Sequence, residues 1–156
     1  MQIDNDTLTQ VACDVFTSML GIPIEPAAQE PADAAEPLVA SYIGVSGDWT
    51  SALEIVTTER VARQIASGMY EAAADNLPEN DVFDALGEIA NMIGGNVKGI
   101  IGGECSLSLP RVDRRREWSF TDTQGAPCTD LHFHCLNGIV AMRLTEKGFC
   151  GTAATS

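Results

Sequence analysis

The stretch DVFDALGEIANMIGGNVKGII, residues 81–101, decides the fold because it shows helical periodicity with one strongly apolar side. At about 100° per residue, its large apolar side chains fall within an arc of roughly 100°. Such an arc needs an apolar surface to pack on, so we expect this helix to lie against a sheet. The members of the arc are Val82, Leu86, Ile89, Ala90, Ile93, Val97 and Ile100, with Phe83 and Ile101 at its edge.

The opposite side of the same helix carries a polar stripe. Asp84, Glu88, Asn91 and Gly95 are spaced i, i+4, i+7 and i+11, so they stack along one ridge. In most amphipathic helices such a stripe is only the wet face. Here, however, asparagine is a weak helix former, and each glycine in a helix interior costs up to about 1 kcal/mol relative to alanine. The stripe therefore indicates a surface that a partner's backbone can approach closely.

The residue types on this ridge restrict its chemistry. No histidine or cysteine stands beside Glu88 and Asn91, so a nucleophile–base pair is excluded there. A carboxamide can both donate to and accept from a water, and phosphoryl hydrolysis depends mainly on a water held in line with the phosphorus. A nearby carboxylate could pair with a partner's lysine. The phosphate and its metal would have to come from that partner, because this helix offers no metal cage.

Composition narrows the class of protein. The chain has 156 residues, a net charge of −13 and five cysteines without a CxxC pair. We expect one domain, reduced thiols and no nucleic-acid partner, since an acidic surface repels phosphate backbones. No run of about 18 apolar residues predicts a membrane span, and the N-terminus does not resemble a signal peptide, so we expect a cytoplasmic protein.

Two further patterns in the sequence bear on possible binding sites. The basic segment RVDRRRE, residues 111–117, suits either a solvated loop or strand end, or a docking patch for an acidic partner. His132 and His134 share one face of a predicted strand and could begin a metal site. No second acidic or cysteine pair is near them in the sequence, so we expect no metal centre.

The remaining periodicities place the other elements. We expect a helix at 5–20 and a second helix that is capped by Thr57 or Thr58 and carries an apolar stripe from Val61 to Tyr70. Two strands are expected in 38–57 around the turn SGDW, short strands at 105–110 and 116–122, and a hairpin at 130–146 turning at Asn137-Gly138. A Pro/Ala/Glu-rich connector at 22–37 and a frayed tail at 148–156 complete a single domain over 1–156. This order predicts an α/β protein of the α+β sort, with helices on one face of a mostly antiparallel sheet.

These motifs together resemble the chemotaxis phosphatases of the CheC/CheX/FliY family. The family's helical signature is Asp or Ser, three residues, Glu, two residues, Asn, which reads here as Asp84, Glu88 and Asn91 within GEIANMIGGN. The preceding strand, strand and helix are also similar, so the likeness covers roughly 38–109 well and the final hairpin loosely. CheC-type members repeat the signature in the first helix. Here that helix, LTQVACDVFTSML, lacks it, so the chain resembles the single-site CheX type.

The resemblance implies a function and a set of roles. A CheX-like protein hydrolyses the phosphoryl-aspartate of a CheY-like response regulator in chemotaxis or two-component signalling. Asn91 would orient the attacking water, Glu88 would pair with the regulator's lysine, and Asp84 and Gly95 would contact the partner. Mg²⁺ is expected on the phosphorylated regulator, no cofactor on this chain, and a homodimer through sheet edges. The alternatives are a receiver-binding adaptor or flagellar-switch module without turnover, and a structural or sensory domain whose ridge is only solvated.

Overall fold

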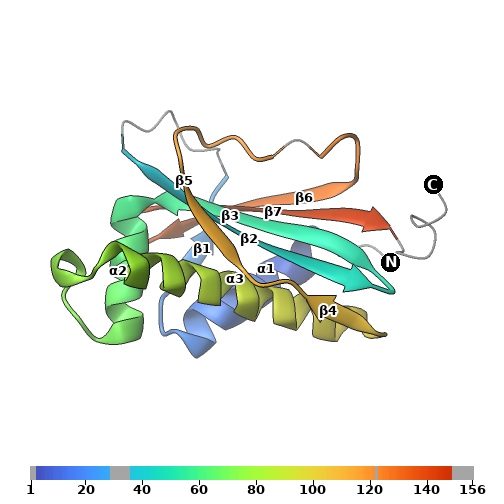
Figure 1. Ribbon diagram of the computed structural model, residues 1–156, viewed down its shortest axis with the longest axis horizontal. Coiled ribbons are helices and arrows are strands. Elements are labelled where there is room, and N and C mark those ends of the chain that lie inside the picture. Colours follow the sequence, from blue (N-terminus) through green and yellow to red (C-terminus); the bar gives the residue numbers. More distant parts are fainter. Residues whose placement is uncertain (1–2, 29–35, 122, 149–156) are drawn as a thin grey trace.

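The computed structural model describes residues 3–28, 36–121 and 123–148, and these form helices packed against one sheet (Figure 1). The helices are α1 (Asn5–Cys13), continued by a π-helical turn (Asp14–Met19), α2 (Glu59–Tyr70), a 3-10 turn (Ala74–Asn76) and α3 (Glu79–Ile101). The strands are β1 (Ile24–Pro26), β2 (Leu38–Gly47), β3 (Thr50–Thr58), β4 (Cys105–Leu107), β5 (Arg111–Arg115), β6 (Cys128–Cys135) and β7 (Gly138–Gly148).

The sheet is antiparallel and runs in the order β1-β6-β7-β3-β2, with β4 and β5 both paired to the outer side of β2. The helices α1, α2 and α3 gather on one of its faces (Figure 1). The predicted fold class is therefore confirmed. None of the helices that the structure describes combines the length and hydropathy needed to cross a lipid bilayer.

Helix α3 packs on the sheet through the arc that its periodicity predicted. Val82, Leu86, Ile89, Ile93 and Val97 are all buried in the main core. Ile100 is the exception at 49% exposed, because it lies in the last turn of the helix. The helix begins at Glu79, two residues before the predicted start.

Two glycines of α3 serve this packing and not a partner, which corrects one expectation. Gly87 and Gly94 are buried. A Cβ on Gly94 would lie 3.0 Å from Ile43 Cγ2, and one on Gly87 would lie 3.4 Å from the ring of Pro110. Their lack of a side chain lets α3 approach β2 and the β4–β5 connection. Of the three glycines near the ridge, Gly95 alone is not buried.

The final hairpin exists, but its turn is one residue earlier than predicted. Cys135 pairs with Gly138, so the turn residues are Leu136 and Asn137, with φ of 49° and 62°. A two-residue turn of type I′ requires a positive φ at both central residues, as found here. Gly138 is instead required by tertiary packing, since a Cβ there would lie 2.4 Å from Val61 Cγ2 of α2.

The predicted connector at 22–37 contains structure. Ile24–Pro26 forms strand β1 on β6, and Ile22 and Ile24 are each only 8% exposed, so both belong to the core. Residues 29–35 of the connector lie outside the described residues, as do 149–156 of the predicted frayed tail. Gly148, the tail's first residue, ends β7.

The arginine-rich segment also differs from expectation. The strand is β5 at Arg111–Arg115, and 116–121 is irregular. Arg114 Nη2 lies 2.9 Å from Glu59 Oε1 and also binds Glu79, while Arg115 binds Glu54. Charged residues thus form an edge strand because acidic groups of α2, α3 and β3 pair with them. These two arginines serve the fold.

Candidate functional site

The ridge of α3 is the candidate site, and the structure brings its predicted members together. Asp84 and Glu88 are exposed, while Asn91 and Gly95 are half-buried. The helix is unbroken from Glu79 to Ile101, so successive members stand about one turn apart, and the whole ridge spans about 16 Å. Glu88 and Asn91 therefore lie on the same side of the helix, about 60° apart around the axis and about 4.5 Å apart along it.

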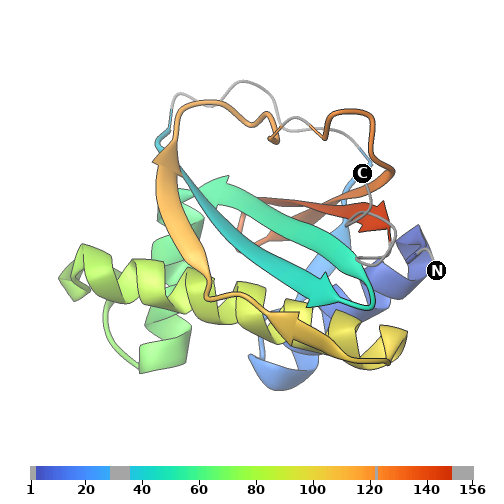
Figure 2. The ribbon, with the colours of Figure 1, turned by 45° about the vertical axis from the view of Figure 1, so that its right-hand side comes forward.

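One flank of the ridge is the extended segment between β4 and β5. Figure 2 shows β4 and β5 following each other along the sheet edge beside α3. Pro110 faces Gly87, and Leu107 Cδ1 lies 3.9 Å from the position of a Cβ on Gly95. Asn91 stands between these two glycines on the helix, one turn from each. The neighbouring segment explains why Asn91 is half-buried and Glu88 exposed.

The other flank carries Tyr70, which sequence analysis assigned only to the end of a helix. Tyr70 is the last residue of α2, which stops where Glu71 adopts a left-handed conformation, and it is 45% exposed. Burial, followed by the carboxylates of Asp84, Asp81 and Glu88, raises the pKa of the Tyr70 phenol. The phenol is therefore neutral at physiological pH and close to the ridge. No signal in the sequence distinguished it from its apolar neighbours.

The polar side chains of the ridge are available to bind a partner molecule. Within the described part of the chain, no side-chain hydrogen bond or ion pair involves Asp84, Glu88 or Asn91. The Glu88 carboxylate can accept an external cation, and the Asn91 amide can both donate to and accept from a water. The ridge is thus suited to hold a water and a lysine at neighbouring points.

A metal centre finds no support among the described residues, which contain no group of three or more His, Cys, Asp or Glu able to hold an ion. His132 and His134 lie on β6, and His134 is opposite Glu25 of β1 in the register of the two strands.

Comparison with known proteins gives the family. The model of the chemotaxis phosphatase CheX family matches residues 39–134. The fold is similar to the chemotaxis protein CheX from Vibrio vulnificus, with a TM-score of 0.73 and 22% identity over 92% of this chain and 95% of that chain. It is also similar to a CheC-like superfamily protein from Shewanella sp. PV-4, with a TM-score of 0.74 and 20% identity over 95% of this chain and 100% of that chain.

A third similar structure is a chain of the CheX–CheY–BeF3–Mg²⁺ complex from Borrelia burgdorferi, with a TM-score of 0.68 and 17% identity over 93% of this chain and 99% of that chain. No curated protein matches the sequence. The structural likenesses show a shared fold, and the family model covers well over half of the residues. The chain belongs to the chemotaxis phosphatase CheX family.

Proposed function

We propose that this protein hydrolyses the phosphoryl-aspartate of a CheY-like receiver domain, with Glu88 and Asn91 as its working groups. One observation carries the proposal: a carboxylate and a carboxamide without partners among the described residues stand together on an outward ridge, in a chain of the CheX family. A similar fold occurs in a complex that contains CheY, beryllium fluoride and Mg²⁺, which is consistent with a receiver as the partner.

In this proposal Asn91 is the catalytic residue. Its amide holds a water in line with the phosphorus, the water oxygen bonds to phosphorus, and the bond from phosphorus to the aspartyl oxygen breaks. Asn91 is half-buried beside the β4–β5 segment, and in this proposal that position keeps the reorganisation of its side chain small when the receiver docks. Mg²⁺ bound by the receiver would neutralise phosphoryl charge.

Glu88 serves docking and alignment. Its exposed carboxylate pairs with a lysine of the receiver, which places the phosphoryl group over Asn91. Asp84 extends the negative surface by one turn, and Tyr70 adds a neutral aromatic group beside it. This acidic surface favours a partner that presents a cation next to its phosphorylation site.

The wider organisation is also part of the proposal. We place the chain as a single domain that works in the cytoplasm, in chemotaxis or two-component signalling, as a homodimer through sheet edges. The edges available for such pairing are β1 on one side and β4 with β5 on the other.

The test is the loss of phosphate from a phosphorylated receiver of the same organism, with Mg²⁺, for the wild type and the variants Asn91→Ala and Glu88→Ala. Removing one preorganised polar group that positions the water lowers the rate by about 10²–10³. Glu88→Ala should chiefly raise KM. Asn96→Ala is the matched control, because Asn96 lies on the same helix outside the ridge and should leave the rate unchanged.

The alternatives give different outcomes in the same experiment. A receiver-binding adaptor would bind the receiver without accelerating phosphate loss, and Asn91→Ala would bind as the wild type does. A structural domain with a merely solvated ridge would bind no receiver. Either outcome contradicts the phosphatase proposal.

A further inference from the structure

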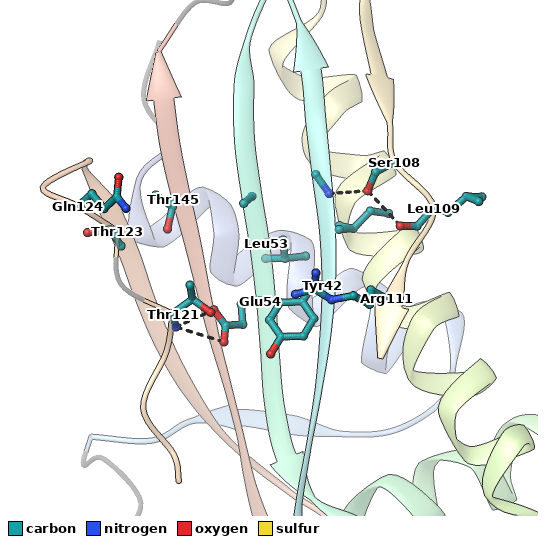
Figure 3. A pocket seen from close by; sticks show the side chains of 13 residues that line it. Tyr42, Leu53, Glu54, Ser108, Leu109, Arg111, Thr121, Thr123, Gln124 and Thr145 are labelled. Atoms are coloured by element: carbon teal, nitrogen blue, oxygen red, sulfur yellow. Dashed lines mark hydrogen bonds between the residues drawn. The ribbon is translucent and has the colours of Figure 1, made fainter. Parts of the chain in front are cut away.

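A second feature lies on the sheet face away from the helices. The outer faces of β2, β3 and β7 line a hollow of about 600 Å³, together with residues Ser108, Leu109, Arg111, Thr121, Thr123 and Gln124. The helices lie behind these strands in the close-up (Figure 3). Its volume is within the range of roughly 300–1,000 Å³ that is typical of small-molecule sites. The ridge of α3 does not contribute to it.

The floor of the hollow lacks large side chains because three small residues are neighbours across the strands. Gly44 pairs with Ala52, and Ala52 pairs with Thr145, so one row of small side chains crosses three strands. Neighbouring strands are about 4.8 Å apart, which makes this row roughly 10 Å long. The row carries no bulky side chain and is largely apolar, so it can accept a planar molecule of one or two rings.

Two segments rise on opposite sides of this floor. Thr121, Thr123 and Gln124 stand on one side, and Ser108, Leu109 and Arg111 on the other (Figure 3). Ser108 Oγ accepts a hydrogen bond of 2.8 Å from Gly44 N and donates to the carbonyl of Leu109 at 3.1 Å, which fixes that wall. The Thr121 amide donates to Glu54 Oε1 at 3.1 Å, which fixes the other.

The charges at the hollow are unequal. Glu54 is 6% exposed, and its carboxylate is already bound by Arg115 and the Thr121 amide. Arg111 stacks over the Tyr42 ring at 4.4 Å, while its Nε is 3.9 Å from Asp113 Oδ2, and its side chain is 73% exposed. Its guanidinium is therefore held flat but only weakly engaged by a carboxylate. Arg111 is therefore the exposed charge of the lining, because the Glu54 carboxylate is buried and already bound.

We propose that this hollow binds a small molecule in which a carboxylate or phosphate is attached to a flat apolar body. The body lies on Gly44 and Ala52, and the anionic group meets Arg111, whose planar fork of N–H donors matches both carboxylate and phosphate. The Thr145 hydroxyl adds a polar group at the far end of the floor. Neutral analogues lack the contact with Arg111 and bind more weakly.

The position of this site relative to the ridge is defined by one segment. Ser108, Leu109 and Arg111 line the hollow, whereas Leu107, Pro110 and Val112 pack against the glycines of α3. An occupant of the hollow therefore touches the same segment that borders Asn91.

The experiment is an NMR titration of the full chain with benzoate, phenyl phosphate and the neutral probe benzyl alcohol. We expect saturable amide shifts concentrated at Gly44, Ala52, Thr121 and Thr145 with one or both anions. The two anionic probes decide which anion is preferred. The binding readout does not depend on phosphatase activity, so its failure and that of the proposed function are separate results.

Three variants make the result specific. Arg111→Ala should weaken anion binding by about 10-fold or more, because a charge-assisted hydrogen bond is lost. Ala52→Leu, which fills the floor, should abolish it. Arg116→Ala is the control, an exposed arginine outside the hollow. The proposal is overturned if no saturable shift occurs at millimolar probe, if benzyl alcohol binds as tightly, or if Arg111→Ala and Arg116→Ala behave alike.

Discussion

Replacing Gly95 with alanine should raise stability. A Cβ at this position would have Leu107 Cδ1 as its nearest neighbour at 3.9 Å, an ordinary van der Waals contact. Alanine is favoured over glycine in a helix interior by about 1 kcal/mol, and no steric term opposes this gain. We expect the free energy of unfolding to rise by about 0.5–1 kcal/mol, with Tm higher by roughly 2–4 °C per kcal/mol.

Gly94→Ala provides the contrast on the adjacent residue. Its Cβ would lie 3.0 Å from Ile43 Cγ2 and 3.5 Å from Leu107 Cδ2. Overpacking of this sort costs about 1–3 kcal/mol, which offsets or exceeds the helix-propensity gain. The assay is urea unfolding of both variants by circular dichroism. A loss of stability in Gly95→Ala, or equal changes in the two variants, would refute the assignment of Gly95 to the open ridge and Gly94 to the core.

The same Gly95→Ala protein also tests docking. If a receiver's backbone approaches the ridge at Gly95, the added methyl group costs about 1–3 kcal/mol of binding free energy and weakens affinity at least about fivefold. Gly99→Ala is the matched control, since a Cβ there has no neighbour within 4 Å and lies about 12 Å along the helix from Asn91. Undiminished receiver affinity in Gly95→Ala would remove Gly95 from the docking surface.

Two other predictions concern the fold. Gly138→Ala should lower the free energy of unfolding by about 1–3 kcal/mol in urea titrations, because its Cβ would lie 2.4 Å from Val61 Cγ2; wild-type stability would show that α2 can move away. Burial raises the pKa of the Cys135 thiol to about 11, so thiol reagents should label exposed Cys128 first and Cys135 only on unfolding. The pKa of the thiol in the unfolded chain is near 9.0, so the stability gained by burying the neutral Cys135 thiol is fully present below about pH 9 and is lost as the pH rises towards 11. Labelling of native Cys135 as fast as Cys128 would contradict the burial of Cys135.

Periodicity predicted the parts of this protein that depend on long amphipathic patterns. The apolar arc of α3 and the opposite ridge follow from helical spacing alone, because every turn repeats the same choice of face. The N-cap of α2 at Thr58, whose side chain accepts from Val61 N, follows from local hydrogen bonding in the same way. The same helical spacing predicts that Glu88 and Asn91 lie on one side of α3, opposite the apolar arc.

The errors arose where distant contacts decide local structure. Asn137-Gly138 is a favourable turn pair by itself, but Val61 of α2 requires the glycine at the next position. A strand as rich in charge as β5, RVDRR, has no apolar pattern and depends on acids from other elements. Tyr70 likewise gains its place beside the ridge only through the packing of α2 on α3.

The central claim is that Asn91 positions the attacking water. The most direct measurement is the single-turnover rate of phosphate loss from a phosphorylated receiver at saturating concentrations of the wild type and of Asn91→Ala, so that differences in affinity do not enter. The account predicts a rate about 10²–10³ lower for Asn91→Ala, with the Asn96→Ala control at the wild-type rate. Equal rates for the wild type and Asn91→Ala, or a wild-type rate no faster than the receiver alone, would contradict it.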